Sequence, residues 1–368
     1  RPVGRTERKE LEKMETSLFG RRLPSPIVIG SGPLSFSADG MIRLHEAGAG
    51  AVVTKTINQN AADNPWRHMV QCDRDTLINC EKWSDYSMEQ WVEHEIPKAV
   101  AAGVNCIASV GHTVADSRLC VERLEDTGCM AVELVSYRDE TVLPMLEDTK
   151  KRVKLPVIVK LSPNSADLIA HAKRCADAGA DGFTACDSMG PVLKIDIETG
   201  RPVLGGKDGY GWLTGAMIRP FILQRICELR KVTGLPIIGL GGVAKWQDAV
   251  EMVMAGADCV GVCSAVILKG PAFIGQLDRQ IDAYLSEHGY AGLEEIRALV
   301  HNHLPAEDEK APYRMEWDEA RCSRCGKCIR VCPYGARAWD NGQMRVDAEA
   351  CRKCGLCVSV CDVLTIKE

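Results

Sequence analysis

The chain of 368 residues contains no run of about 18 consecutive apolar residues, so it offers no candidate for a membrane-spanning helix. Its first residues are charged and have no apolar core, so we expect no secretory signal. The formal net charge is −5 and the sequence pI is about 6.0, so no basic surplus points to nucleic acid. These absences favour a cytoplasmic protein without membrane or nucleic-acid partners.

Cysteine, by contrast, is abundant, with 18 residues in two distributions. Ten lie scattered between Cys72 and Cys263 with no repeated spacing, and eight form a strict pattern between Cys322 and Cys361. A disulfide framework is typical of short secreted chains, which this is not. We therefore interpret the first ten as small buried hydrophobic residues in a reducing compartment, and the last eight as ligands.

Eight short apolar runs alternate with helix-length amphipathic stretches. Each run is continuous, as expected for a strand buried on both faces of a parallel sheet. Eight such units in about 265 residues predict a closed (β/α)8 TIM barrel, an α/β fold. A doubly wound open sheet is the alternative, but no Gly-x-Gly-x-x-Gly follows the first run. The predicted strands are 26–30, 51–55, 105–110, 131–135, 157–161, 182–185, 237–240 and 259–262.

The pattern of apolar residues also predicts helices, a hairpin and the domain boundaries. It predicts helices over 165–178, with Ser165 as a possible N-cap, and over 245–255. Two apolar runs flank Glu198-Thr199-Gly200 inside the insertion 189–214, which indicates a hairpin at the active face of the barrel. We expect the barrel with a short N-terminal extension over 1–300, a linker over 301–315, and a small α+β ferredoxin-like two-cluster domain over 316–368.

The eight C-terminal cysteines form two runs of the pattern C-x2-C-x2-C-x3-C, which ligates [4Fe–4S] clusters. The fourth cysteine of each run belongs to the other cluster in two-cluster ferredoxins. Structural zinc in a four-cysteine site is the alternative. The expected ligand sets are Cys322, Cys325, Cys328 and Cys361 for one cluster, and Cys351, Cys354, Cys357 and Cys332 for the other.

A barrel joined to two electron-transferring clusters needs a cofactor that accepts single electrons and also performs organic chemistry. Flavin does both. The seventh and eighth strands end in Gly241-Gly242 and Cys263-Ser264, whose backbone amides would form a phosphate site. Lys160 ends the fifth strand between apolar neighbours, where its ammonium could stabilise a reduced flavin. A solvent-facing lysine is the alternative.

Several stretches resemble the dihydroorotate and dihydropyrimidine dehydrogenase family of FMN-binding barrels. They are Val53-Thr54-Lys55-Thr56, Val159-Lys160-Leu161-Ser162-Pro163-Asn164, Ile195-Asp196-Ile197-Glu198-Thr199-Gly200, Leu213-Thr214-Gly215-Ala216-Met217-Ile218-Arg219-Pro220 and Gly241-Gly242. An FMN barrel followed by two clusters also resembles the C-terminal part of dihydropyrimidine dehydrogenase. The resemblance implies FMN contacts from Ser31, Gly32, Lys55, Thr56, Asn79, Lys160, Gly215, Gly241, Gly242, Cys263 and Ser264.

The sequence departs from this family after the fourth strand. There the family carries Glu-Leu-Asn-Leu-Ser-Cys (or Ser)-Pro and a mobile loop, with the Asn on the pyrimidine and the Cys or Ser as acid or base. Here the chain continues Glu133-Leu134-Val135-Ser136-Tyr137-Arg138-Asp139, without the cysteine and without the loop. A site that loses its hydrogen-bonding partners loses the matching substrate, so we expect little use of dihydroorotate.

Four residues near strand ends could replace the missing acid or base and the missing substrate contacts. His112 could exchange a proton, Arg138 could bind a carboxylate, and Asp187 could meet a cation, with Tyr137 beside them. Each of the four has a plain alternative as a loop or rim residue.

We therefore expect a flavin-dependent oxidoreductase that uses FMN and two [4Fe–4S] clusters. It would transfer hydride between flavin N5 and an activated C=C or CH–CH bond of a small carbonyl or carboxylate substrate. Two alternatives stay open: an electron-transfer subunit without an organic substrate, and a dihydropyrimidine or dihydroorotate dehydrogenase with a displaced acid or base. The expected partners are an external electron donor or acceptor protein, either a ferredoxin or a flavoprotein, and a second copy of the chain in a homodimer.

Overall fold

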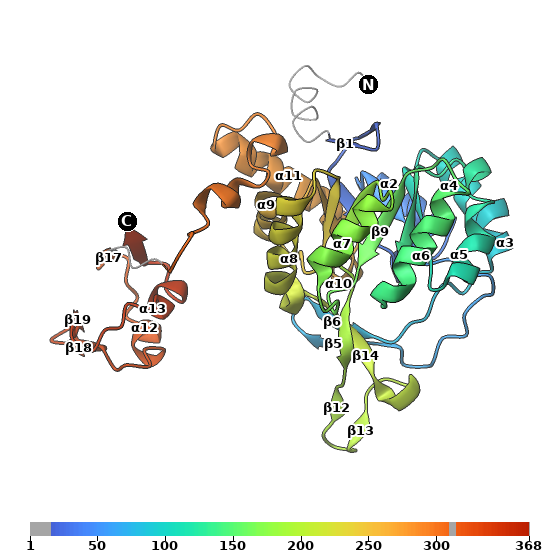
Figure 1. Ribbon diagram of the computed structural model, residues 1–368. Coiled ribbons are helices and arrows are strands. Elements are labelled where there is room, and N and C mark those ends of the chain that lie inside the picture. Colours follow the sequence, from blue (N-terminus) through green and yellow to red (C-terminus); the bar gives the residue numbers. More distant parts are fainter. Residues whose placement is uncertain (1–15, 309–313, 368) are drawn as a thin grey trace. The chain divides into compact units, whose positions relative to one another are not determined.

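The computed structural model describes residues 16–308 and 314–367, and eight parallel strands close into a barrel (Figure 1). All eight predicted strands are confirmed within one or two residues, and the alternative of an open sheet is excluded. The order around the barrel is β10-β15-β16-β3-β4-β7-β8-β9. The strands are β3 Ile27–Ile29, β4 Ala51–Val53, β7 Cys106–Gly111, β8 Ala131–Val135, β9 Val157–Leu161, β10 Gly182–Ala185, β15 Ile237–Leu240 and β16 Cys259–Val262.

Helices surround the barrel and bury its outer face. The predicted helix 245–255 is confirmed as α9, but the N-cap prediction at Ser165 is wrong. Helix α7 begins at Leu168 because Asp167 accepts the backbone N–H of Ala170, whereas the Ser165 hydroxyl donates to Asp139. The helices are α2 Ala38–Glu46, α3 Met88–Gln90, α4 Ile96–Ala101, α5 Val114–Val121, α6 Asp139–Lys150, α7 Leu168–Asp177, α8 Arg219–Val232, α9 Trp246–Ala255, α10 Ser264–Lys269 and α11 Ala272–Glu287.

One end of the barrel is plugged by a short hairpin of β1 (Thr16–Leu18) and β2 (Arg21–Leu23). Its Leu18 and Leu23 are buried among the amino-terminal residues of the barrel strands, such as Val28 and Ala51. This end is therefore filled with hydrocarbon, and a cavity can form only toward the carboxyl ends of the strands.

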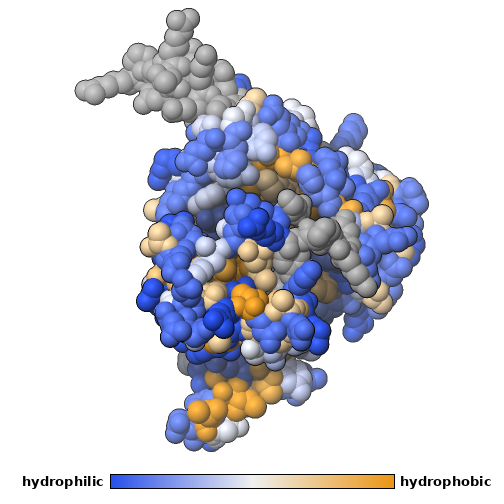
Figure 2. All heavy atoms as spheres, turned by 90° about the vertical axis from the view of Figure 1, so that its left-hand side faces the viewer, coloured by the Kyte–Doolittle hydropathy of each residue, from blue (hydrophilic) through white to orange (hydrophobic). Residues whose placement is uncertain are grey.

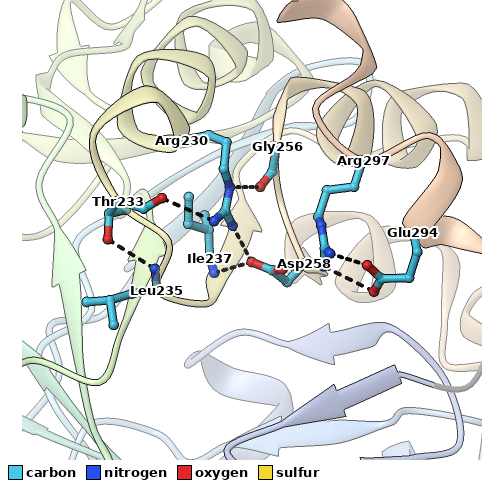
Figure 3. A network of polar contacts seen from close by, with 8 residues as sticks. All are labelled: Arg230, Thr233, Leu235, Ile237, Gly256, Asp258, Glu294 and Arg297. Atoms are coloured by element: carbon cyan, nitrogen blue, oxygen red, sulfur yellow. Dashed lines mark hydrogen bonds and ion pairs between the residues drawn. The ribbon is translucent and has the colours of Figure 1, made fainter.

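Polar contacts around Asp258 fasten helix α8 and the segment after α11 to the start of β16 (Figure 3). Asp258 accepts the backbone N–H of Ile237 at 2.8 Å and pairs with Arg230 and Arg297. Arg230 also donates from Nε to the carbonyl of Gly256 at 2.8 Å. One carboxylate thus joins three elements that are far apart in sequence.

A four-stranded antiparallel sheet stands at the opposite end, in the order β11-β14-β6-β5. It combines β5 (Met69–Asp73) and β6 (Thr76–Asn79) with β11 (Met189–Val192) and β14 (Gly211–Gly215) from the insertion. The predicted hairpin is confirmed as β12 (Ile195–Asp196) and β13 (Arg201–Pro202), and it projects beyond the sheet (Figure 1). The apolar residues Ile195 and Ile197 are exposed in it. Figure 2 shows a hydrophobic patch at the lower end of the molecule, where this hairpin lies.

The chain divides into two compact units between His303 and Leu304. The predicted linker spans this division, and its residues 309–313 lie outside the described residues. Short 3-10 helices precede it at Leu293–Glu295 and Leu299–His303. The second unit holds the strand pairs β17 (Arg314–Trp317) with β20 (Leu364–Lys367) and β18 (Arg337–Asp340) with β19 (Gln343–Val346), and the helices α12 (Lys327–Arg330) and α13 (Leu356–Ser359). Among the described residues no helix is both long and apolar enough to cross a membrane.

Candidate active site and cluster-binding module

A cavity of about 470 Å³ opens at the carboxyl ends of the barrel strands. Parallel strands bring their carboxyl ends together, so residues scattered through the sequence meet in one place. Every barrel residue proposed from the sequence as a cofactor or catalytic residue lines this cavity: Ser31, Gly32, Lys55, Thr56, Asn79, His112, Tyr137, Arg138, Lys160, Asp187, Gly215, Gly241, Gly242, Cys263 and Ser264. The roles of these residues stay predictions.

Lys160 lies in the cavity wall between two carboxylates and is buried. Its Nζ is 3.6 Å from Asp187 Oδ1 and 3.9 Å from Glu133 Oε1. Burial alone would lower the pKa of Lys160, but Asp187 and Glu133 together raise it above its usual value. The ammonium is therefore charged across the physiological range, and the alternative of a solvent-facing lysine is excluded.

Glu133 is the acid of this group that sequence reasoning did not single out. Its Oε2 accepts the Thr184 hydroxyl at 2.7 Å, while its buried Oε1 has no hydrogen-bond partner among the described residues. A charged residue in the middle of a buried strand was the available signal, because such residues are almost never buried without a partner.

A second buried lysine is also paired. Lys55 Nζ donates to Glu81 Oε2 at 2.9 Å, and Glu81 Oε1 lies 3.7 Å from His68 Nε2. Lys55 and Glu81 both line the cavity. No local pattern indicates Glu81, because this residue lies in the loop after β6 and reaches Lys55 only through the tertiary fold.

Aromatic rings form one wall of the cavity. The rings of Tyr137 and Trp212 stack with centroids 3.9 Å apart and an interplanar angle of 17°. His112 stacks on the other side of Tyr137 at 6.1 Å, and Trp83 lies 6.3 Å from His112.

Two groups of the aromatic wall can carry protons. Burial lowers the pKa of His112 despite the opposing charge of Asp187, so its imidazole is neutral at pH 7. The Tyr137 ring is partly exposed at 37%, yet desolvation of its hydroxyl, with Asp187 nearby, raises its pKa, while a hydrogen bond with Ser188 opposes this. His112 is thus set to accept a proton and Tyr137 to donate a hydrogen bond.

The strand that departs from the family runs directly into a helix. Val135 is buried, lines the cavity, and contributes an apolar surface where the family has an amide. Helix α6 starts at Asp139, immediately after the exposed Arg138 at the cavity rim. The expected absence of a loop is therefore confirmed among these residues.

The opposite side of the cavity has the backbone of a phosphate cradle. Gly241 and Gly242 adopt φ values of 131° and 99°, and a Cβ on Gly242 would come within 2.5 Å of Arg219 Cβ. A Cβ on Gly32 would lie 2.8 Å from Cys263 Sγ. Ser264 and Thr214 share a hydrogen bond of 2.9 Å beside them. Only glycines leave the backbone accessible here, which fits the phosphate end of FMN.

One cavity of the second unit brings together cysteines from both sequence runs, while the ligand sets stay predictions. Cys332, Cys351, Cys354 and Cys357 line one cavity, although Cys332 comes from the other sequence run. Burial, followed by the neighbouring thiols of Cys361 and Cys322, raises the pKa of Cys328. In the part of the chain that the structure describes, no three such side chains converge on a single ion site.

The remaining ten cysteines are all free thiols, and six of them are buried: Cys106, Cys120, Cys129, Cys175, Cys186 and Cys259. This agrees with their interpretation as small hydrophobic fillers.

The comparisons with known proteins match both units. The dihydroorotate dehydrogenase family model matches residues 13–285, and the 4Fe-4S dicluster domain matches residues 314–362. A similar protein is the dihydroorotate dehydrogenase B (NAD(+)) catalytic subunit of Methanothermobacter thermautotrophicus, 30% identical over 78% of this chain and 99% of that protein. The subunit of the same name from Pyrococcus furiosus is 31% identical over 78% of this chain and 98% of that protein.

These names do not support the expectation that dihydroorotate is a poor substrate. The alignments use nearly the whole length of those relatives but only 78% of this chain. The family holds FMN, and its members are flavin-dependent oxidoreductases acting on CH–CH groups. This chain belongs to the dihydroorotate dehydrogenase family and carries an additional 4Fe–4S dicluster domain.

Proposed function

We propose that this chain oxidises dihydroorotate, or a closely similar dihydropyrimidine, with a proton acceptor that differs from the one in its relatives. The observation that carries the proposal is the single cavity in which two buried lysines, an arginine and the neutral imidazole of His112 meet. The catalytic-subunit names of the relatives support the same reaction.

Each polar group of the cavity matches one feature of such a substrate. Arg138 at the rim has no ion-pair partner among the described residues, so its guanidinium is available for a carboxylate. Asp187 can accept a ring N–H, and the Tyr137 hydroxyl, held protonated, can donate to a ring carbonyl.

The reaction needs a base for the proton on the carbon next to the one that loses hydride. His112 fills this role, because its imidazole is neutral and Asp187 stabilises the imidazolium that forms. FMN, when bound, supplies hydride acceptance and one-electron transfer to the clusters. Lys160 and Lys55 provide positive charge at the cavity wall, which favours an anionic form of the cofactor.

Turnover of dihydroorotate by the cluster-loaded enzyme tests this assignment. His112→Ala is expected to lower kcat by about 100-fold or more while flavin content stays unchanged, the usual effect of losing a general base. The matched control is His94→Ala, which removes an exposed histidine outside the cavity. Full activity of His112→Ala would remove His112 as the base, and no flavin reduction by dihydroorotate or dihydrouracil would exclude the proposed substrate class.

One observation favours a second candidate. Val135 and the stacked Tyr137 and Trp212 form a flat apolar wall, which suits an activated double bond in a less polar small carbonyl or carboxylate compound. In that case the reduced enzyme is reoxidised by an enone or an enoate, and dihydroorotate leaves the flavin oxidised. If neither class reacts, the electron-transfer-subunit alternative is favoured.

We also infer that an external redox protein exchanges electrons with the cluster module. The relatives are named as catalytic subunits, which implies a companion subunit in those enzymes, and the dicluster domain gives this chain its own electron route. A ferredoxin or flavoprotein fits this role, and the homodimer stays a prediction. Stopped-flow mixing of the reduced enzyme with ferredoxin or flavodoxin tests the route, since no cluster oxidation by either would contradict it.

A further inference from the structure

A buried arginine lies beside the cysteines of the cluster module. Arg337 begins strand β18 and lines the cavity formed by Cys332, Cys351, Cys354 and Cys357. Its side chain is 5% exposed, which is unusual for an arginine. It therefore holds a full positive charge away from water.

Among the described residues, the guanidinium of Arg337 forms hydrogen bonds only with sulfur. Arg337 Nη1 donates to Met344 Sδ at 3.0 Å, and Nη2 donates to Met315 Sδ at 3.1 Å. Thioether sulfur is a weak, uncharged acceptor, so these contacts do not balance the charge. The ion pairs found among the described residues of this unit, Arg345 with Asp340 and Lys367 with Glu316, do not include Arg337.

A buried charge without an opposite charge is strongly unfavourable, so this guanidinium requires a counter-charge. The cysteines provide it once they are thiolates bound to clusters. Met315 links Arg337 to the ligand set, because it also accepts a weak contact from Cys357 Sγ at 3.9 Å.

We propose that Arg337 is a counter-charge that raises the reduction potential of the [4Fe–4S] cluster held by Cys332, Cys351, Cys354 and Cys357. Reduction adds one electron, and so one negative charge, to a cluster. A fixed positive charge nearby stabilises the reduced state more than the oxidised state. The inference concerns the electron route alone and does not depend on the identity of the organic substrate.

The test is an EPR-monitored redox titration of the full-length, cluster-loaded enzyme. Arg337→Met removes the charge and keeps a long flexible side chain that can pack with Met315 and Met344. We expect the cluster reduction equilibrium to become at least tenfold less favourable, which is a shift of about −59 mV for one electron. The matched control is Arg345→Met in the same strand pair, where the arginine side chain is 75% exposed.

A second substitution separates charge from shape. Arg337→Lys keeps the charge and loses the forked donor geometry, so its potentials are expected to lie near those of the wild type. Potentials of Arg337→Met equal to those of Arg345→Met would overturn the proposal. If Arg337→Met does not hold its iron, the comparison moves to Arg337→Gln. If Arg337→Met, Arg337→Gln and Arg337→Lys all fail to bind iron, the proposal is also overturned. The arginine would then be required for its shape and not for its charge.

Discussion

The charged group around Lys160 makes a quantitative prediction about the stability of the barrel. Replacing Lys160 with methionine removes the cation that lies 3.6 Å from Asp187 and 3.9 Å from Glu133. With an effective dielectric constant of about 20, each attraction is about 4 to 5 kcal/mol before the desolvation of the charges is subtracted. Breaking such a buried group by deleting one partner destabilises proteins by about 3–5 kcal/mol.

We expect the free energy of unfolding of Lys160→Met to fall by about this amount. The assay is urea unfolding of flavin-free protein at pH 7, so that cofactor binding does not add to the difference. Lys173→Met, which changes an exposed lysine of α7, is the matched control. In the double variant with Glu133→Gln, the uncompensated buried carboxylate is gone, and part of the lost stability is expected to return.

The dependence on pH has a defined sign. In the wild type the pKa of Lys160 is raised on folding, so its stabilising contribution is fully present below the unfolded pKa of about 10.4 and is lost only as pH rises through the folded pKa. The deficit of Lys160→Met relative to the wild type is therefore expected to shrink only at alkaline pH, above about 10. A loss below about 1 kcal/mol at pH 7 would refute this reasoning.

Three further substitutions test other parts of the molecule. Asp258→Asn removes the negative charge that Arg230 and Arg297 share. The free energy of unfolding, measured by thermal unfolding, is expected to fall by about 2 kcal/mol. An unchanged stability would contradict the contacts in Figure 3. Gly242→Ala places a methyl group 2.5 Å from the Cβ of the first residue of α8, so flavin content after purification should drop sharply. Cys332→Ser should remove the cluster of the second cysteine run, and EPR that shows the first run affected instead would disprove crossed ligation.

The sequence was most informative where a single physical rule decides the outcome. Continuous apolar runs predicted all eight barrel strands, because a strand covered on both faces has no polar side to alternate with. The cysteine spacing predicted the cluster module for a similar reason, since few other sites require that pattern. The predicted cofactor and catalytic residues follow strand ends, and they lie in one cavity because parallel strands bring their carboxyl ends together.

The sequence was least informative where partners meet only through the tertiary fold. Glu81 and Trp212 come from loops and an added sheet, and nothing local indicates that they face Lys55 and Tyr137. The missing loop after β8 was recognised, but it suggested a change of substrate that the comparisons do not support. The N-cap of α7 was misplaced because Ser165 and Asp167 are both good caps, and the contact with Asp139 decides between them.

The composition of the small unit's interior has a consequence for how the enzyme matures. Among the described residues its apolar cluster of fully buried side chains is Cys328, Cys357 and Leu364, with half-buried apolar side chains around it, so two of the three are predicted metal ligands. A module of this size with so little hydrocarbon inside gains most of its folding free energy from the metal it binds. The barrel, with its own large core, can fold before any iron arrives, whereas the module folds only as the clusters are inserted. Iron supply and exposure to oxygen would then control whether the flavin can exchange electrons through the clusters, while the flavin-binding barrel stays folded.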